Sequence, residues 1–578
     1  MIILGLNAFH ADAAACLVKD GVVVSAVAEE RLGLRRKHFA GFPVEAIKHV
    51  LAASGIGIRD VDVVAVGHDS KANVAAKAGY AIRNPARAIG SALNFLSRER
   101  QIASLNERIA SDCGFPLANC RFTVAHVEHH LAHLASSFWG SGYHSAAGFS
   151  YDASGDFVSA AYARCERDID IIERVFLPHS LGYFYSALCQ FIGFDDFGEE
   201  YKVMGLAAYG TPTFMPLMER LLRYESRGQY RLDSKYFAGV MQKSQEELLD
   251  ANGRIVTPAL YSDALIKELG APRKRGEPLT ERDNNIAASC QLHFENVVVE
   301  CLRWLHSQMP TDKLVTAGGC ALNGVCNARI LRDTPFKQMY VHGAAGDDGT
   351  AVGAALETWH RSGGATAASI QEVYWGPSHP DDEIKVALDA AGLEATKLDY
   401  NTLIERVSAE LSQGKVVGWY QGQSEWGPRA LGNRSILAHP GWPGMKDMIN
   451  HKVKRRESFR PFAPSILEHR VGDFFEQSVE SPFMMHVVRI KDDKREAMAA
   501  VRHEDGTGRV HTVSREQNPI YFDLISAFAN RTGTPVLLNT SFNENEPIVD
   551  TPEQAIACFM RNDIDFLCIG SYVVAKSA

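Results

Sequence analysis

Four histidines stand close together in the run HVEHHLAHLASSFW, at His126, His129, His130 and His133. If this run is helical, all four imidazoles share about 100° of one helical face. Two HxxxH pairs result, and rings one turn apart can close on a single metal ion. The alternative is a solvated polar face, or histidines satisfied inside the core. Because no glutamate directly follows His129, the run lacks the base of the HExxH protease motif.

Two acidic turns offer oxygen ligands for the same ion. YDASGD carries Asp152 and Asp156, and GAAGDDGTAVGAALETW places Asp347 and Asp348 between a predicted strand and a predicted helix. One carboxylate of the second turn would complete a mixed site of histidine and aspartate. The segment LVTAGGCALNG sets Gly318 at a similar strand-to-helix turn, where a nucleotide phosphate could approach the backbone, although a simple helix cap is the alternative.

The elements that must position these residues follow two patterns. From residue 1 to about 360, strand-like runs such as IILGLN, VDVVAVG and KLVTAGG alternate with helical stretches, which is typical of an α/β fold. The segment SGGATAAS, residues 362–369, is a predicted linker. We therefore expect domains at 1–361 and 371–578, and the aromatic and β-branched strands of the second favour a mixed α+β domain.

The first region contains a weak internal repeat. A strand, a polar turn, a second strand, a tight hairpin and a third strand occur in IILGLNAFHADAAACLVKDGVVVSAVAEE and again in AAGFSYDASGDFVSAAYARCERDIDIIERVF. Two such units predict a duplicated nucleotide-binding core of the actin and sugar-kinase (ASKHA) type. Its turns would offer backbone N–H groups to phosphates and carboxylates to a metal.

Composition limits the other possibilities. The chain has 578 residues, a net charge of −9, 46% apolar and 22% charged residues, which is ordinary for a large enzyme and disfavours a broad grip on nucleic acid. We predict no membrane segment and no signal peptide, because no apolar run reaches about 18 residues and the N-terminus lacks a basic region. Eleven cysteines without CxxC pairs are typical of reduced thiols, so the expected location is cytoplasmic.

Several motifs together resemble one family. HVEHHLAH, YDASGD, EEYKVMGLAAYG, AGGCALNGVCNARI, GDDGTAVGAA, GPRALGNRSIL, RRESFRPFAPS and LLNTSFNENEPIVD resemble, in this order, the O-carbamoyltransferases that include the nodulation protein NodU and the cephem and aminoglycoside carbamoyltransferases. The resemblance covers nearly the whole chain. It implies a metal-bearing, actin-like N-terminal ATPase, similar to that of the tRNA threonylcarbamoyladenosine pathway, followed by a YrdC-like domain. Where the family usually has DGVGE, this chain has DASGD, so Asp156 replaces a glutamate.

What the resemblance implies is a reaction in two steps. The YrdC-like domain would make carbamoyl adenylate from carbamoyl phosphate and ATP with Mg²⁺, and the actin-like domain would transfer the carbamoyl group to a hydroxyl of a small-molecule acceptor. The family pattern implies a divalent metal, with Fe²⁺ favoured over Zn²⁺ or Mn²⁺. The implied ligands are His129, His133, Asp152 and Asp347; His126 with His130 is the other register. The implied nucleotide-binding residues are Gly318, Gly319, Asn323 and Lys202, the last of which could instead pair with Glu199 or Glu200.

Physical chemistry adds roles to these motifs. Phosphates require fixed cations, and arginine forks match phosphate oxygens. For the basic run KVKRRESFRPF, the alternative to phosphate binding is a solvated basic face or an RNA-binding patch. The Phe and Pro residues interleaved in this segment favour a packed pocket instead. Proton removal from the acceptor hydroxyl suits histidine, so His10 beside Asp12 is the first candidate base and His38 the second, unless each only bonds local backbone. The candidate carbamoyl phosphate and ATP residues are Arg429, Asn433, Arg434, Ser435, Lys454, Arg460, Arg509 and Asn539.

Two other functions remain open at this stage. A tRNA-modifying or tRNA-binding protein could share the same domain pair, but the net charge and the fused domain order disfavour it. A non-catalytic ATP-binding regulator of the actin-like class would have no reason to keep the arginine motifs. The acceptor and the oligomeric state cannot be read from the sequence.

Overall fold

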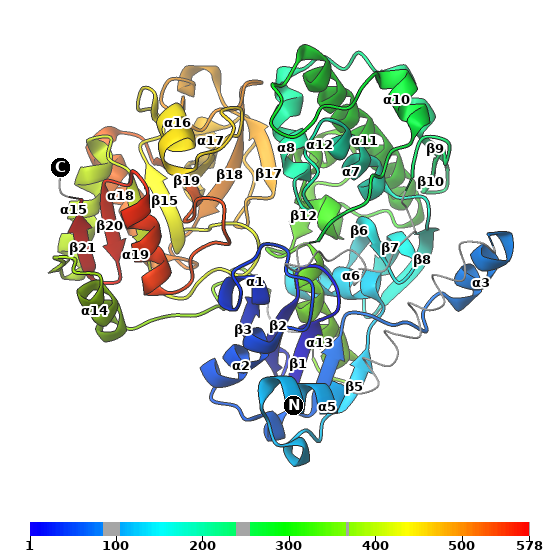
Figure 1. Cartoon of the computed structure of the whole chain (residues 1–578), viewed down its shortest axis with the longest axis horizontal. Helices are drawn as coiled ribbons and strands as arrows, with labels where there is room; N and C mark the ends of the chain where they lie inside the picture. Colours follow the sequence, from blue (N-terminus) through cyan, green and yellow to red (C-terminus); the bar gives the residue numbers. More distant parts are fainter. Residues whose placement is uncertain (85–104, 239–254, 366–368, 577–578) are drawn as a thin grey trace. The chain divides into compact units, whose positions relative to one another are not determined.

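The chain forms two compact units, Met1–Ile370 and Gln371–Ala578. The computed structural model describes residues 1–84, 105–238, 255–365 and 369–576 (Figure 1). The predicted linker at 362–369 lies partly outside these described residues. All eleven cysteines of the chain are free thiols, as the absence of CxxC pairs predicts.

The N-terminal unit begins with a five-stranded sheet in the order β3-β2-β1-β4-β5. Strand β1 is antiparallel to β2 and parallel to β4, and β4 is parallel to β5. A tight turn with positive φ at Asp20 and Gly21 joins β2 to β3, as the hairpin pattern predicts. The strands are β1 (Ile2–Asn7), β2 (Ala14–Lys19), β3 (Val22–Ala28), β4 (Val63–Val66) and β5 (Thr123–His126).

A second five-stranded sheet repeats the first. Its order is β12-β11-β6-β7-β8, and its first strand, β6, is again antiparallel to the second and parallel to the fourth. Asp156 and Phe157, both with positive φ, form the hairpin turn between β6 and β7. This equivalence confirms the duplicated actin-like core that the internal repeat predicts. The strands are β6 (Ala146–Gly155), β7 (Val158–Cys165), β8 (Ile169–Phe176), β11 (Lys313–Ala317) and β12 (Gln338–Val341).

Two helices are exchanged between the halves. Helix α6 (His129–Ser141) follows β5 of the first sheet but packs on β6 and β11 of the second, whereas α13 (Thr350–Arg361) follows β12 and packs on β1, β2 and β4. The two helices also pack against each other (Figure 1). Their close approach requires a glycine, because a Cβ on Gly353 would lie 1.8 Å from the carbonyl oxygen of Ala132. The N-terminal ends of these helices carry the candidate site.

Further helices cover the two sheets. Leu4 and Leu6 of β1 pack with α2 and α5 in one core cluster, while Gly5 between them faces α13. In the part of the chain that the structure describes, no helix combines the length and apolarity that a bilayer crossing requires. The remaining elements of this unit are α1 (Glu29–Leu32), α2 (Val44–Ala53), α3 (Val74–Arg83), α5 (Leu105–Cys113), α7 (Leu181–Phe191), α8 (Glu200–Leu206), α9 (Met215–Leu221), β9 (Leu222–Ser226), β10 (Gln229–Leu232), α10 (Asp263–Leu269), α11 (Glu281–Gln308) and α12 (Gly324–Asp333).

The C-terminal unit is built on one mixed nine-stranded sheet, in the order β13-β21-β20-β14-β15-β19-β16-β18-β17. Trp419, Tyr521 and Phe528 are buried in its core between the sheet and helices α15 and α18. The elements are α14 (Asp381–Ala390), β13 (Thr396–Lys397), α15 (Tyr400–Ser412), β14 (Val417–Tyr420), β15 (Arg434–Ala438), α16 (Met445–Met448), β16 (Ala463–Leu467), α17 (Val471–Phe474), β17 (His486–Arg489), β18 (Thr507–Val513), α18 (Pro519–Thr532), β19 (Val536–Ser541), α19 (Pro552–Arg561), β20 (Phe566–Ile569) and β21 (Tyr572–Ala575).

The glycine contact between α6 and α13 gives a testable prediction. We expect Gly353→Ala to lower the free energy of unfolding by about 3 kcal/mol, because the added methyl group meets a backbone carbonyl that cannot rotate away. Urea denaturation of the full chain measures this loss. The matched control is Gly79→Ala in α3, where the neighbour is the flexible end of Arg83 and alanine favours the helix. Equal stability of the two variants would contradict the close contact.

Candidate metal centre and arginine cluster

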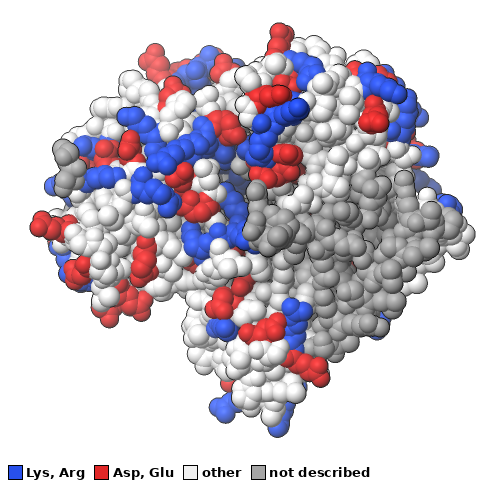
Figure 2. All heavy atoms as spheres, in the orientation of Figure 1, with Lys and Arg blue, Asp and Glu red and all other residues white. Residues whose placement is uncertain are grey.

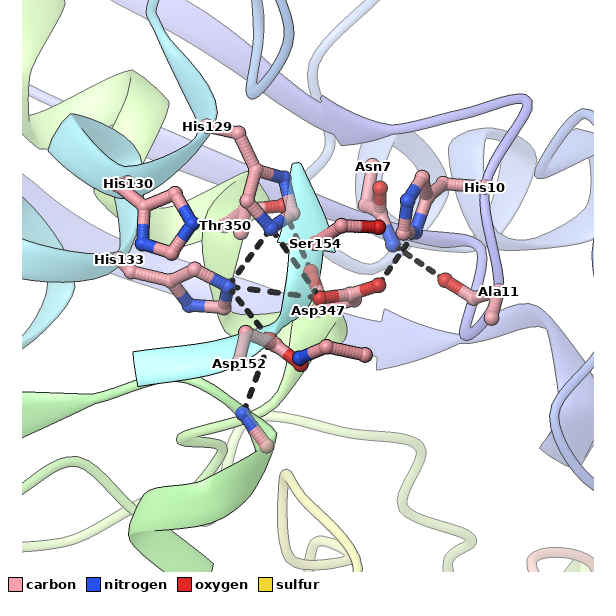
Figure 3. A network of polar contacts seen from close by, with 12 residues as sticks. Asn7, His10, Ala11, His129, His130, His133, Asp152, Ser154, Asp347 and Thr350 are labelled. Carbon is pink, nitrogen blue, oxygen red and sulfur yellow. Dashed lines mark hydrogen bonds and ion pairs between the residues drawn. The ribbon is translucent and has the colours of Figure 1, made fainter. Parts of the chain in front are cut away.

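Four side chains of the N-terminal unit converge on one point. His129 and His133 come from the first two turns of α6, Asp152 from β6, and Asp347 from the 3₁₀ turn η6 (Asp347–Gly349) that leads into α13. One nitrogen or oxygen atom from each lies within 4.8 Å of the others. Figure 3 shows the two imidazoles and two carboxylates pointing toward one another. Each half of the duplicated core therefore contributes to the cluster.

The spacing of these atoms matches the first coordination sphere of a metal. His129 Nε2 lies 3.0 Å from His133 Nε2, which lies 3.3 Å from Asp152 Oδ2 and 3.4 Å from Asp347 Oδ1. With bonds of about 2.1 Å, neighbouring ligands lie about 3.0 Å apart in an octahedral site and about 3.4 Å apart in a tetrahedral site. Two imidazoles with two carboxylates suit Fe²⁺, Zn²⁺ or Mn²⁺. The residues present fit the predicted metal.

Burial and neighbouring charges shift the pKa values of His129, His133 and Asp347. Burial and the charge of His133 lower the pKa of His129 to about 4. For His133, burial alone lowers the pKa, but the hydrogen bonds and charges of Asp152 and Asp347 outweigh it and raise the pKa to about 9. The neighbouring histidines hold the pKa of Asp347 well below its usual range despite burial. Of the two imidazoles, His133 is therefore the one whose surroundings favour a positive charge.

The histidine run does not lie on one helix, so the predicted face of four imidazoles is wrong. Glu128 caps α6 by accepting the N–H of Leu131, and the helix starts only at His129. His126 ends β5 and is exposed. His130 is buried and directed away from the cluster, with Nδ1 2.8 Å from Ser150 Oγ and Nε2 3.0 Å from the carbonyl oxygen of Val158. The register of His126 with His130 therefore cannot form this cluster.

Local backbone fixes the carboxylates. Asp152 Oδ2 accepts the N–H of Gly319 at 3.0 Å, so the glycine turn after β11 orients this side chain. Of the two neighbouring aspartates, only Asp347 enters the cluster. Asp348 accepts the N–H of Gly349 at 3.0 Å, and burial with the charge of Asp12 raises its pKa to about 8.

The candidate bases occupy different surroundings. His10 Nδ1 pairs with Asp347 Oδ2, so Asp347 connects His10 to the cluster (Figure 3). His38 Nδ1 lies 2.8 Å from Asp12 Oδ1. Burial lowers the pKa of His38, but Asp12 and Glu30 outweigh it and raise the pKa to about 9. Both candidates therefore pair with a carboxylate through Nδ1, and the choice between His10 and His38 as the base stays a prediction.

The predicted nucleotide-binding residues have structural partners. Gly318 and Gly319 stand between β11 and α12, at the strand-to-helix turn that the sequence predicts. Asn323 caps α12 by accepting the N–H of Cys326 and exchanges hydrogen bonds with Gln291. Lys202 forms an ion pair of 2.7 Å with Glu199, the alternative noted from the sequence. A nucleotide role for these four residues stays a prediction.

The C-terminal unit contains four arginines whose positive charges lie close enough to act on one another. Arg509 on β18 has its Nε buried without a hydrogen-bond partner among the described residues. Burial and the positive charges of Arg429, Arg456 and Arg460 lower its pKa well below the usual range. Like charges gathered at a partly buried point are unfavourable unless an anion binds there. We refer to Arg429, Arg456, Arg460 and Arg509 as the arginine cluster.

Two of the predicted phosphate-binding cations, Arg434 and Lys454, form hydrogen bonds with backbone carbonyls of the protein. Arg434 is fully buried over the ring of Tyr420, and its Nη atoms donate to the carbonyls of Gln421, Asn433, Pro377 and Gly422. Lys454 Nζ donates to the carbonyls of Ser541 and Asn543 at 2.5 and 2.7 Å and to Asn543 Oδ1 at 2.6 Å. Backbone carbonyls accept from both Nη atoms of Arg434 and from Lys454 Nζ, so both cations have partners inside the protein. A direct contact of either one with a phosphate stays a prediction.

The predicted polar residues form a scaffold beside the arginine cluster. Asn433 Nδ2 donates to the carbonyl of Gln423, and Ser435 Oγ accepts the N–H of Gly432. Asn539 Nδ2 donates to the carbonyl of Ala430 and to Ser465 Oγ, while its buried Oδ1 has no partner among the described residues. Asn539 therefore presents one unused acceptor.

Sequence reasoning missed Glu425, Ser541 and Asn543. Buried Glu425 Oε1 accepts the N–H groups of Leu431, Asn433 and Arg434, which shapes the GPRALGNR loop. A carboxylate a few residues before an arginine-rich loop was an available signal. Ser541 and Asn543 hold Lys454, a contact between residues 87 and 89 positions apart that no local pattern reveals.

Surface charge is of mixed sign on the face drawn in Figure 2, where Lys and Arg side chains alternate with Asp and Glu. Ion pairs at the surface of the chain include Arg531 with Glu405 and Arg561 with Glu546.

Comparison with known proteins identifies the family of this chain. A family model described as the carbamoyltransferase N-terminus matches residues 2–356, and one described as the carbamoyltransferase C-terminus matches residues 408–576. The chain belongs to the carbamoyltransferase family. This carbamoyltransferase is 37% identical over 588 residues to the nodulation protein NolNO of Sinorhizobium fredii, covering 99% of this chain and 80% of that one.

Other relatives of the carbamoyltransferase include a named enzyme. It is 36% identical over 362 residues to the 3'-hydroxymethylcephem-O-carbamoyltransferase of Streptomyces clavuligerus, covering 60% of this chain and 58% of that one. It is 36% identical over 615 residues to an uncharacterized Synechocystis protein, covering 100% and 97%. Among solved structures, HypF of T. kodakarensis is similar with a TM-score of 0.30 and 13% identity, covering 63% of this chain and 48% of that chain.

The cluster geometry predicts which histidine is needed for metal. We expect His133→Ala to lose most of the Fe²⁺, Zn²⁺ or Mn²⁺ that the wild-type carbamoyltransferase retains, because His133 Nε2 is the atom that contacts the other three ligands. Metal content after dialysis, measured by atomic emission, tests this. His126→Ala, at an exposed strand end, is the control and should retain the metal. Loss of metal in His126→Ala with retention in His133→Ala would refute this assignment.

The His38 pair predicts a pH dependence of stability. Its pKa rises from 6.5 to about 9 on folding, so protonated His38 stabilises the fold below pH 6.5, and this contribution is lost as pH rises through about 9. His38→Gln and Asp12→Asn should both remove this component from urea midpoints measured across that range. If both variants keep the wild-type pH dependence, the pair does not have this role.

Proposed function

We propose that this chain is an ATP-dependent O-carbamoyltransferase that activates carbamoyl phosphate in its C-terminal unit and transfers the carbamoyl group to a hydroxyl in its N-terminal unit. The observation that carries the proposal is the grouping of Arg429, Arg456 and Arg460 around buried Arg509, because several guanidinium groups close together favour an anionic ligand such as a phosphate. The metal centre and His10 supply the groups that transfer would need. The similarity to the 3'-hydroxymethylcephem-O-carbamoyltransferase of Streptomyces clavuligerus supports the same reaction class.

The first half-reaction makes carbamoyl adenylate. Releasing both phosphate and pyrophosphate consumes one water: carbamoyl phosphate is hydrolysed to carbamate and phosphate, and a carbamate oxygen then attacks the α-phosphorus of ATP and expels pyrophosphate. The arginine cluster binds the phosphate oxygens of both substrates, with Mg²⁺ on ATP. Asn539 Oδ1, the buried acceptor without a partner among the described residues, suits an N–H of the carbamoyl group.

The second half-reaction moves the carbamoyl group to an alcohol and releases AMP. A divalent metal held by His129, His133, Asp152 and Asp347 would supply a Lewis acid for the adenylate phosphate. Asp347 holds Nδ1 of His10, which favours the tautomer that presents the Nε2 lone pair to the acceptor hydroxyl. The positive end of the α12 dipole suits the anionic nucleotide. The acceptor is proposed as a small molecule with a hydroxyl group.

The division of labour can be tested with single variants. We expect Arg509→Ala to reduce carbamoyl-phosphate-dependent exchange between pyrophosphate and ATP by about 100-fold or more, because one phosphate-binding guanidinium is lost. Exposed Arg515, which pairs with Asp523, is the matched control, and Arg515→Ala should keep wild-type exchange. His133→Ala should also keep exchange but lose carbamoyl transfer to an alcohol such as a hydroxymethylcephem.

The outcomes separate the competing functions. Absent exchange in the wild-type chain would refute adenylate formation, even if ATP and metal bind. Equal loss of exchange in Arg509→Ala and His133→Ala would contradict the assignment of one half-reaction to each unit. Turnover that requires tRNA would instead favour the tRNA-modification function.

A further inference from the structure

Asp156 is a buried carboxylate at the β6–β7 hairpin that lies outside the four candidate ligands. Its side chain is fully shielded from solvent. Asp156 Oδ2 accepts the backbone N–H of His129 at 2.8 Å and that of Asp69 at 2.9 Å, and Oδ1 lies 2.5 Å from His68 Nδ1. Two backbone donors and one imidazole therefore share a single carboxylate, which accounts for a charged group at a position without water.

These partners come from separate parts of the N-terminal unit. His68 and Asp69 follow β4 of the first sheet, His129 begins α6, and Asp156 closes the hairpin of the second sheet. The joined elements include the carriers of three candidate ligands, because α6 holds His129 and His133 and β6 holds Asp152. The Asp156 carboxylate thus connects the strand and the helix whose relative position sets the shape of the metal centre.

Two carboxylates accept N–H groups at the start of α6, one from a residue next to the helix and one from a residue far away in the sequence. The first N–H groups of a helix have no partner within the helix and favour negative charge. Glu128 accepts the N–H of Leu131 from within the same segment, whereas Asp156 accepts the N–H of His129 across 27 residues. The local cap defines where the helix begins, and the distant one fixes where that beginning lies in space.

The imidazole of His129 is also confined by the same hairpin. Gly155 lies against the ring, and a Cβ at this position would be 1.9 Å from His129 Cδ2. Gly155 leaves room for the imidazole ring of His129, and the carboxylate of Asp156 binds the backbone N–H of the same residue. Both the direction and the position of His129 Nε2 follow from these contacts.

We infer that Asp156 is a positioning residue for the metal centre, which holds His129 through its backbone and ties α6 to β6. The inference rests on the proposed metal centre and adds a residue that does not contact the metal. Groups that orient ligands in this way typically change metal affinity by about 10–100-fold when they are removed.

The test is the metal affinity of the full chain, measured by competition with a chelator for Zn²⁺ and Mn²⁺. Asp156→Asn keeps the size of the side chain and tolerates the positive φ of the turn, but loses the charge and one acceptor. We expect it to bind metal about tenfold or more weakly, while pyrophosphate exchange in the C-terminal unit stays unchanged. Asp156→Glu, which restores the carboxylate, should recover part of the affinity.

A matched control distinguishes positioning from general loss of stability. Glu357 on α13 is also a buried carboxylate and accepts Trp139 Nε1 of α6 at 2.9 Å. Trp139 lies about 15 Å further along the helix than His129. Glu357→Gln should lower the thermal unfolding midpoint without weakening metal binding. Metal loss in Glu357→Gln equal to that in Asp156→Asn would overturn the inference.

Two further results of the metal-affinity experiment also bear on the positioning role of Asp156. Wild-type metal affinity in Asp156→Asn overturns the inference alone, whereas absence of metal binding in the wild-type chain overturns the metal centre and the inference together. If Asp156→Asn does not fold, His68→Gln is the deciding variant, since it leaves the carboxylate and its two backbone bonds in place. A severalfold weaker affinity in His68→Gln supports the positioning role, and unchanged affinity counts against it.

Discussion

The N-terminal unit depends on the contact between two helices that the duplicated halves exchange. The N-terminal turns of α6 and α13 lie side by side because Gly353 allows the two backbones to come into contact. That meeting brings His129 and His133 of one half against Asp347 of the other. Burying two imidazoles and two carboxylates so close together is costly without a cation, so the fold creates the need that a metal would satisfy. The surrounding hydrogen bonds serve to keep this arrangement from relaxing.

The C-terminal unit also buries charged groups, but there the charges are positive. Arg434 and Lys454 are buried, but carbonyl oxygens surround them, so their charge maintains the shape of the loop and of the strand ends. The Nε atom of Arg509 has no hydrogen-bond partner among the described residues, and the charges of Arg429, Arg456 and Arg460 lie near it. Cations that contact carbonyls can hold a pocket in place, while several guanidinium groups close together favour an anionic ligand. The grouping of guanidinium groups around Arg509 therefore distinguishes the proposed anion site.

Much of the fold could be predicted from local patterns, since the repeated hairpin units correctly indicated the duplicated core. For the metal centre, local patterns left the HxxxH register and the aspartate open. The family resemblance selected His129, His133, Asp152 and Asp347, whose side chains converge in space. His126 was misplaced because a helix start depends on a cap, here Glu128, and a periodic pattern does not show where the cap acts. Arg434 and Arg509 look alike in sequence. Only the tertiary fold decides which guanidinium meets carbonyls, and no periodicity reveals contacts such as that of Lys454 with Asn543.

The exchange of helices also bears on how the chain is made. One face of the first sheet, formed within the first 66 residues except for its edge strand β5, is covered by α13, which begins only at Thr350. At about 5–20 residues per second, a ribosome needs roughly 15 to 60 s to synthesise the intervening segment. During that time the apolar face around Gly5 has no native cover. The nascent chain therefore has a prolonged window in which chaperone binding or mispairing with another copy competes with folding, a cost that follows directly from the helix exchange.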